Sequence, residues 1–362
     1  MSIFAREREL SVLKKLYNSN QSEFLAIYGR RRIGKTFLIR NFFKEKGIYF
    51  ELTGIKNSSY KHQLHAFTIE FFRVFNTKPL QKITNWLEAF DELRNAIERS
   101  STKKRIILFF DELPWLATPK SNFTQTLDHF WNRYLSDDHR IILIVCGSAA
   151  SWMIKKIICD KGGLHGRLTE KIRLLPFDLQ ETEQFLSSRG IILDRKQLIE
   201  LYMAIGGVAK YLTYIERGKS SLQEINRICF NGPLFKEFEE LYSSLFSNYN
   251  HHISIVKTLA KQTSGFTKSQ ISQATNIANG GGLTDILYEL EESGFISSSS
   301  SFGKKKYDLR FRLIDEYSIF YIKWIEASKS IDLQGYDDHF WLRQAIRLLV
   351  VLGSDTLLNL FA

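Results

Sequence analysis

Short apolar runs recur through the first half of the chain, and stretches with helical spacing separate them. A strand buried on both faces of a parallel sheet shows such a continuous run rather than strict alternation. The runs predict five strands, at residues 23–28, 48–52, 106–110, 140–146 and 171–176. Helical spacing is found at residues 6–17, 36–44, 60–98 and 123–134. This alternation favours a parallel sheet with helices on both faces.

The strand pattern stops at about Asp178. Residues 178–245 have helical spacing broken at two glycine-containing pairs, which predicts a small helical domain. Residues 250–315 predict three helices and then a hairpin, which is the order of a winged helix–turn–helix. Residues 316–327 have the pattern of an amphipathic aromatic helix. We therefore expect an α/β domain at 1–177, a helical lid at 178–245, a winged helix at 246–315 and a helical tail at 316–362.

A glycine-bearing loop follows the first predicted strand and opens a predicted helix. It fits the phosphate-loop pattern G-x-x-x-x-G-K-[ST] without a mismatch. Its glycines let backbone N–H groups wrap phosphates, and the helix N-terminus adds partial positive charge. Lys35 is expected to contact the β- and γ-phosphates of ATP, and Thr36 to ligate Mg²⁺. The expected nucleotide-binding residues are Gly29, Arg30, Arg31, Arg32, Ile33, Gly34, Lys35 and Thr36.

An acidic pair ends the third predicted strand. Asp111 follows four apolar residues, as does the carboxylate that holds Mg²⁺ or its water in P-loop proteins. Glu112 comes next, where hydrolytic ATPases keep the base that orients the attacking water. The alternative is an acidic pair that stabilises a helix N-terminus.

These motifs together resemble prokaryotic AAA+-like ATPases of the archaeal type, which are related to the signal-transducing STAND group. The resemblance covers about residues 3–325 and rests on FAREREL, YGRRRIGKT, LFFDELPWLA, LIVCGSAASWM, HGRLTEKIRLLPF and GGVAKYL. It implies an α/β P-loop NTPase fold, a helical lid and a winged helix. It also implies that Ser148 reads the γ-phosphate and that Arg167 acts as an arginine finger. A small turn residue and a surface arginine are the respective alternatives.

The resemblance has further implications and two departures. Arg6 and Glu7 match a segment near the base pocket, whereas Ala5 and Ala209 replace the family's usual glycine and proline. Many relatives carry another C-terminal, nuclease-like domain. After Trp341 this sequence no longer resembles the family, so we expect a truncation, with a frameshift as one explanation. No nuclease site is assigned to this chain.

The 362-residue chain is basic, with 50 Lys and Arg against 39 Asp and Glu. A net charge of +11 fits a nucleic acid partner or ordinary solubility. The three cysteines form no metal-binding spacing. The first ten residues carry charges where a signal peptide is apolar, and the sequence has no apolar run of about 18 residues. We expect a cytoplasmic protein that does not enter membranes.

Three functions fit these observations. The first is an ATP-binding, slowly hydrolysing conformational switch. The second is an ATP-gated DNA-binding regulator that uses the basic hairpin at Lys304–Lys306, although the preceding helix is acidic. The third is a nucleotide-binding remnant without turnover. A small-molecule kinase is disfavoured because no acceptor pocket is evident, and a GTPase because no NKxD motif is found. A protein partner or homo-oligomer remains open.

Overall fold

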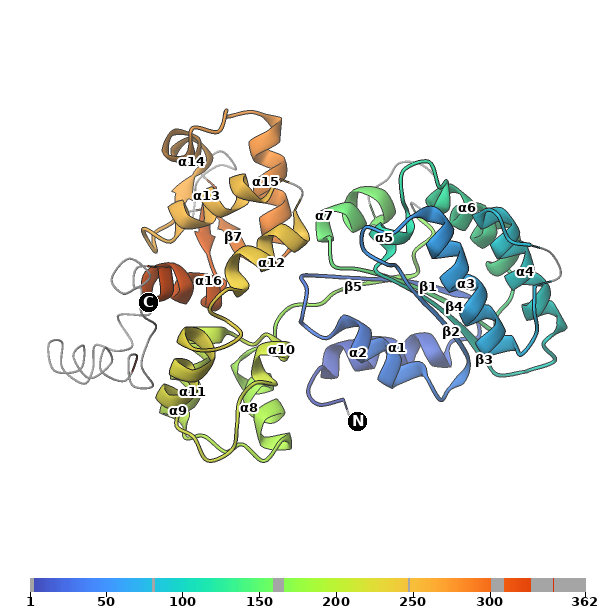
Figure 1. Ribbon diagram of the computed structural model, residues 1–362, viewed down its shortest axis with the longest axis horizontal. Helices are drawn as coiled ribbons and strands as arrows, with labels where there is room; N and C mark the ends of the chain where they lie inside the picture. The colour runs from blue at the N-terminus through green and yellow to red at the C-terminus, as the bar shows by residue number, and fades with distance from the viewer. Residues whose placement is uncertain are drawn as a thin grey trace, which may run out of the picture. The chain divides into compact units, whose positions relative to one another are not determined.

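The computed structural model describes residues 3–79, 82–158, 166–246, 248–300, 309–326 and 341. The chain forms two compact units (Figure 1). The first unit comprises Met1–Gly29 and Gly34–Leu174, and the second comprises Arg30–Ile33 and Leu175–Ala362. The glycine-bearing loop is therefore divided: its ends belong to the first unit, and its four-residue tip groups with the second. Within the described ranges, no helix is both long and apolar enough to cross a membrane.

The first unit is built on a five-stranded sheet in the order β2-β3-β4-β1-β5. Every pair of neighbouring strands is parallel, as the sequence pattern predicts. The strands are β1 (Glu23–Tyr28), β2 (Gly47–Thr53), β3 (Arg105–Asp111), β4 (Ile141–Gly147) and β5 (Glu170–Arg173). β5 is shorter than the predicted strand at 171–176, because the neighbouring β1 ends at Tyr28, opposite Arg173.

Helices cover both faces of this sheet (Figure 1). Phe24, Ala26 and Tyr28 of β1 join a large aromatic core cluster, while Leu25 and Ile27, equally buried, point to the opposite face. Helices α3, α4 and α6 pack on the aromatic face, and α1 and α2 lie on the other. The helices of this unit are α1 (Glu7–Asn18), α2 (Lys35–Phe43), α3 (Tyr60–Phe75), α4 (Trp86–Arg99), α5 (Leu113–Leu116), α6 (Phe123–Phe130) and α7 (Ala150–Met153). π-Helical segments η1 (Trp131–Leu135) and η2 (Ile154–Ile158) extend α6 and α7.

The helical pattern at residues 60–98 corresponds to two helices. α3 ends at Asn76, which adopts a left-handed conformation with φ 49°. α4 begins after Asn85, whose side chain accepts the N–H of Glu88. Helix caps therefore interrupt a segment whose apolar spacing alone continues.

The second unit is helical and carries one small sheet in its described part. Its first helices are α8 (Leu179–Ser188), α9 (Arg195–Ile205), α10 (Ala209–Leu212), α11 (Ser221–Ile225) with η3 (Asn226–Phe230), and α12 (Glu237–Leu245). Then come α13 (Tyr249–Leu259), β6 (Phe266–Thr267), α14 (Lys268–Thr275), α15 (Gly281–Glu292), β7 (Ile296–Ser299), β8 (Arg310–Leu313) and α16 (Glu316–Phe320) with η5 (Tyr321–Glu326). The sheet is antiparallel, in the order β6-β8-β7. Lys304–Lys306 and residues 342–362 lie outside the described residues.

The glycine pair after α9 has a backbone cause. Gly206 has φ +62°, in the left-handed region. A Cβ on Gly207 would lie 1.8 Å from the carbonyl oxygen of Phe177, whose N–H donates to the Gly207 carbonyl at 2.8 Å. Glycine is therefore required at Gly207 for two backbone segments to approach.

Candidate functional site

The phosphate-loop sequence connects β1 to α2. Gly29 has φ 141° and Gly34 has φ 95°, and α2 begins directly at Lys35. The first-turn N–H groups of a helix have no intrahelical partners, and the helix dipole makes this end positive. The loop therefore ends on a helix N-terminus suited to an anion.

Lys35 points back across the loop. Its side chain is buried, and Nζ donates a hydrogen bond to the Gly29 carbonyl at 2.7 Å. The contact holds the ammonium between the two ends of the loop. A phosphate oxygen within the loop would therefore meet a positive charge that is already positioned.

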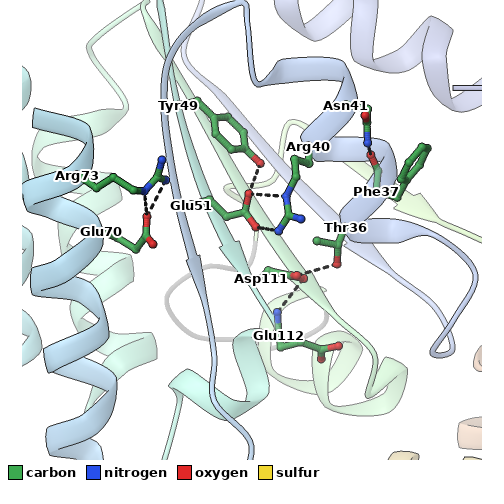
Figure 2. A network of polar contacts seen from close by, with 10 residues as sticks. All are labelled: Thr36, Phe37, Arg40, Asn41, Tyr49, Glu51, Glu70, Arg73, Asp111 and Glu112. Carbon is green, nitrogen blue, oxygen red and sulfur yellow. Dashed lines mark hydrogen bonds and ion pairs between the residues drawn. The ribbon is translucent and has the colours of Figure 1, made fainter. Parts of the chain in front are cut away.

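Thr36 and Asp111 join α2 to the end of β3 (Figure 2). Thr36 Oγ1 donates to Asp111 Oδ2 at 2.7 Å, and the Glu112 N–H donates to Asp111 Oδ1 at 3.0 Å. Burial raises the pKa of Asp111, and the hydrogen bond from Thr36 opposes this rise. A hydroxyl and a carboxylate oxygen are hard ligands of the kind Mg²⁺ prefers beside phosphates, so these residues fit the metal.

Glu112 reaches sideways to the end of β4 rather than capping its own helix. It precedes α5 with φ 49°, but its side chain makes no capping bond. The Ser148 hydroxyl donates to Glu112 Oε1, and the Ser148 N–H donates to Oε2 at 3.2 Å. Both carboxylate oxygens are thus fixed by one residue. Glu112 still directly precedes α5, so the contact with Ser148 leaves the helix-stabilising alternative open, and the roles of both residues stay predictions.

Cys146 lies next to Asp111 and was not singled out as a site residue by sequence reasoning. The two side chains are hydrogen-bonded, and burial raises the pKa of the Cys146 thiol well above its ordinary value. Its position follows from the parallel register, because Phe110 of β3 pairs with Val145 of β4. The sequence contained the two strands but not their order in the sheet.

A second polar group lies beside the site (Figure 2). Glu51 accepts from Tyr49 Oη at 2.8 Å and from Arg40 Nε at 3.1 Å. Burial raises the pKa of Tyr49, and the neighbouring carboxylate of Glu51 adds to this rise. This group links β2 to α2 next to Thr36.

The remaining predicted residues are placed as follows. Arg167 is exposed ahead of β5, and in the described ranges the hydrogen-bonded chain of Thr36, Asp111, Glu112 and Ser148 does not include it. At the loop tip, Ile33 is buried, Arg31 is half-buried, and Arg30 and Arg32 pair with carboxylates of the second unit. Arg6 is buried at the start of α1, and Glu7 is exposed.

Comparisons with known proteins show which proteins this chain resembles. Over 349 residues the chain is 25% identical to an uncharacterized protein of Methanocaldococcus jannaschii, MJECL04, and the aligned region covers 92% of this chain and 71% of the relative. It is 44% identical over 43 residues to an uncharacterized ATP-binding protein of the same organism, MJ0423, over 12% of this chain and 73% of that one. The Walker-type ATPase PABY2304 of Pyrococcus abyssi shares the fold, with a TM-score of 0.57 at 17% identity over 89% of this chain and 96% of that structure.

The family comparison covers more than half of the sequence. Residues 3–215 match the model of an ATPase domain predominantly from Archaea, a span that includes the phosphate loop, the acidic pair and Ser148. The chain therefore belongs to this family of P-loop ATPase domains.

Proposed function

We propose that this protein binds ATP with Mg²⁺ and hydrolyses it slowly, so that bound nucleotide switches the arrangement of its C-terminal elements. The observation that carries the proposal is the hydrogen-bonded chain of Thr36, Asp111, Glu112 and Ser148, together with the Lys35 ammonium held on the Gly29 carbonyl. It combines a phosphate-binding ammonium, a pair of oxygen ligands and a fixed carboxylate. Membership of the ATPase family supports the same conclusion.

Binding follows from the loop and the residues after it. Backbone N–H groups between Gly29 and Thr36 would surround the phosphates, and the Lys35 ammonium would contact the β- and γ-phosphates. Thr36 Oγ1 and Asp111 would hold the metal, which neutralises phosphate charge when bound. Burial raises the pKa of Asp111, so without metal its carboxylate is protonated more easily than an exposed one.

Hydrolysis would depend on Glu112. The Glu112 carboxylate, held by two Ser148 donors, would accept a proton from water as its oxygen attacks the γ-phosphorus. The bond to the bridging oxygen would then break and leave ADP with inorganic phosphate. Because Ser148 holds the base, it is proposed to position the water and to sense the γ-phosphate. Arg167 is proposed as a finger for a neighbouring subunit, since its side chain is exposed.

The C-terminal unit would read out the nucleotide state. We assign α8 to α12 as the helical lid, and α13 to β8 as the winged helix, with residues 178–245 and 246–315 as their expected bounds. Such a switch requires two arrangements that differ in their affinity for ATP. A protein partner or a second copy would respond to that difference.

DNA binding is the alternative readout. The acidic side chains of α15 argue against DNA binding, but less strongly than the sequence alone suggests, because two of these carboxylates bind other residues of the protein. Glu289 contacts His252 Nε2 at 2.9 Å, and Glu291 accepts from the Ser298 N–H at 2.8 Å. In the basic hairpin, Arg310 donates to the Gly265 carbonyl at 3.1 Å. These contacts explain the acidic residues structurally but identify no DNA-binding surface.

Phosphate release from ATP with Mg²⁺ tests the proposal. Wild-type protein should release phosphate slowly, at a rate per subunit that rises with protein concentration if Arg167 acts across an interface. Arg167→Ala should lower the rate and remove this concentration dependence. Absence of phosphate release at any concentration would reduce the function to nucleotide binding. The same assay is repeated with duplex DNA. We expect an unchanged rate of phosphate release, whereas a changed rate would favour the DNA-binding alternative.

A further inference from the structure

The tip of the phosphate loop is built into the C-terminal unit through its arginines. Arg30 is almost completely buried and forms an ion pair with Asp315, which precedes α16. The Arg30 guanidinium also lies over the ring of Phe295, 4.9 Å from its centroid. A buried arginine requires a counter-ion, because an uncompensated charge in the interior is strongly destabilising. Asp315 supplies that charge.

Asp315 is itself held in place. Its Oδ2 accepts the Ser318 N–H at 3.0 Å and the Ser318 hydroxyl at 2.6 Å, and its Oδ1 faces Arg30. One oxygen therefore caps α16 while the other anchors the loop. The Ser318 hydroxyl is also 3.0 Å from Tyr242 Oη, which ties this anchor to α12.

Arg32 is anchored at two points. Its guanidinium pairs with Glu237, the first residue of α12, and Glu237 also accepts from Tyr211 Oη at 3.0 Å. The Arg32 carbonyl accepts the N–H of Lys210 at 3.0 Å. Both the side chain and the backbone of Arg32 are thus fixed by helices of the second unit.

The backbone of Arg32 needs such support. Its φ of 71° lies in the left-handed region, which disfavours residues with a Cβ and persists where the surroundings impose it. A left-handed residue within a loop turns successive N–H groups toward one side and forms a concave anion site. The contacts that impose this φ therefore also keep the loop in a phosphate-binding shape.

We propose that Asp315 and Glu237 are positioning residues for ATP binding, which act by holding Arg30 and Arg32 so that the phosphate loop is preorganised. This inference rests on the proposed function and extends it. Because the two guanidinium groups are paired with carboxylates, Arg30 and Arg32 contribute to the nucleotide site through their backbone. Loop shape, and hence ATP affinity, becomes a property of the C-terminal unit. Whatever alters α12 or the start of α16 alters affinity at the loop.

Two conservative variants test the proposal in the full chain. Glu237→Gln is the gentler change, since Arg32 is 36% exposed and can turn to solvent. Asp315→Asn is the stronger change, since its partner is buried. The matched control is Glu224→Gln, because Glu224 is equally buried, pairs with the half-exposed Arg227, and has no described contact with the loop. Circular dichroism and thermal unfolding establish that each variant is folded.

ATP with Mg²⁺ is titrated calorimetrically, which separates the dissociation constant from the fraction of active protein. We expect Glu237→Gln and Asp315→Asn to weaken ATP binding by about tenfold or more, a typical coupling between distinct elements. The binding stoichiometry should stay unchanged, and Glu224→Gln should bind like wild type. A purely structural role would instead lower the stoichiometry and leave the dissociation constant unchanged.

Each result is decisive. Wild-type affinity in folded Glu237→Gln overturns the proposal, even if Asp315→Asn fails to fold. An equal loss in Glu224→Gln also overturns it, because the effect would then be general to buried pairs. No ATP binding by wild-type protein would refute the proposed function itself, which is a different outcome from unchanged affinity in the variants.

Discussion

Replacing Glu112 by glutamine should separate ATP binding from turnover. Glutamine keeps the size of the side chain and one acceptor oxygen, so one of the two Ser148 contacts can persist. It cannot accept a proton from water. A positioned general base contributes about 10²–10⁴-fold to rate, and we expect phosphate release to fall within that range. Glu112 is half-buried, so replacing its charged hydrogen bonds by neutral ones should change the free energy of unfolding by only about 1 kcal/mol.

The assay pairs phosphate release with ATP affinity on the same protein. Glu112→Gln should bind ATP within about threefold of wild type, a difference below 1 kcal/mol. Glu51→Gln is the matched control, because Glu51 is also a carboxylate beside the site, but it is held by Tyr49 and Arg40. This control should keep both affinity and turnover. Unchanged phosphate release in Glu112→Gln would refute the assignment of the base, and parallel loss in Glu51→Gln would show that the effect is not specific.

Three further results are expected. Because burial raises the pKa of Asp111, ATP affinity in the presence of Mg²⁺ should fall as pH is lowered, and the fall should begin at a higher pH than for an ordinary aspartate. Asp111→Asn should not show this part of the pH dependence. Burial and Asp315 raise the pKa of Glu316 from 4.5 to about 7, so this carboxyl destabilises the fold as pH rises through that window. Glu316→Gln should therefore raise the free energy of unfolding by about 3 kcal/mol at pH 8 and by nothing below pH of about 4.5, as urea denaturation would show. Gly207→Ala should lower the unfolding free energy by about 3 kcal/mol, because the new Cβ would overlap the Phe177 carbonyl. An unchanged thermal unfolding midpoint would contradict this close approach.

The sequence predicts a feature well where all the residues that define it lie in one short segment. The phosphate loop, the acidic pair and the apolar runs of the parallel sheet are each encoded within ten residues, and the described sheet matches that prediction. The break between α3 and α4 was missed because capping by Asn76 and Asn85 interrupts a continuous apolar pattern.

Contacts between distant segments could not be read in this way. Arg30 and Asp315 are 285 positions apart, and the spacing of charges along the chain gives no reason to pair them. The contact between Ser148 and Glu112 depends on β3 and β4 being neighbours in the sheet. Sequence motifs thus predict which residues carry the chemistry, whereas tertiary packing determines what holds each of them.

Calorimetric titration of ATP into wild-type protein and Lys35→Ala, with Mg²⁺ present, measures directly whether the phosphate loop binds a triphosphate through Lys35. Lys35 is buried within the loop, and removing one partner of a buried charge pair costs about 2–5 kcal/mol, or at least about 30-fold in affinity. We expect measurable binding by wild type and a loss of this size in folded Lys35→Ala. Equal affinity of the two proteins, or no wild-type affinity for ATP, would contradict it.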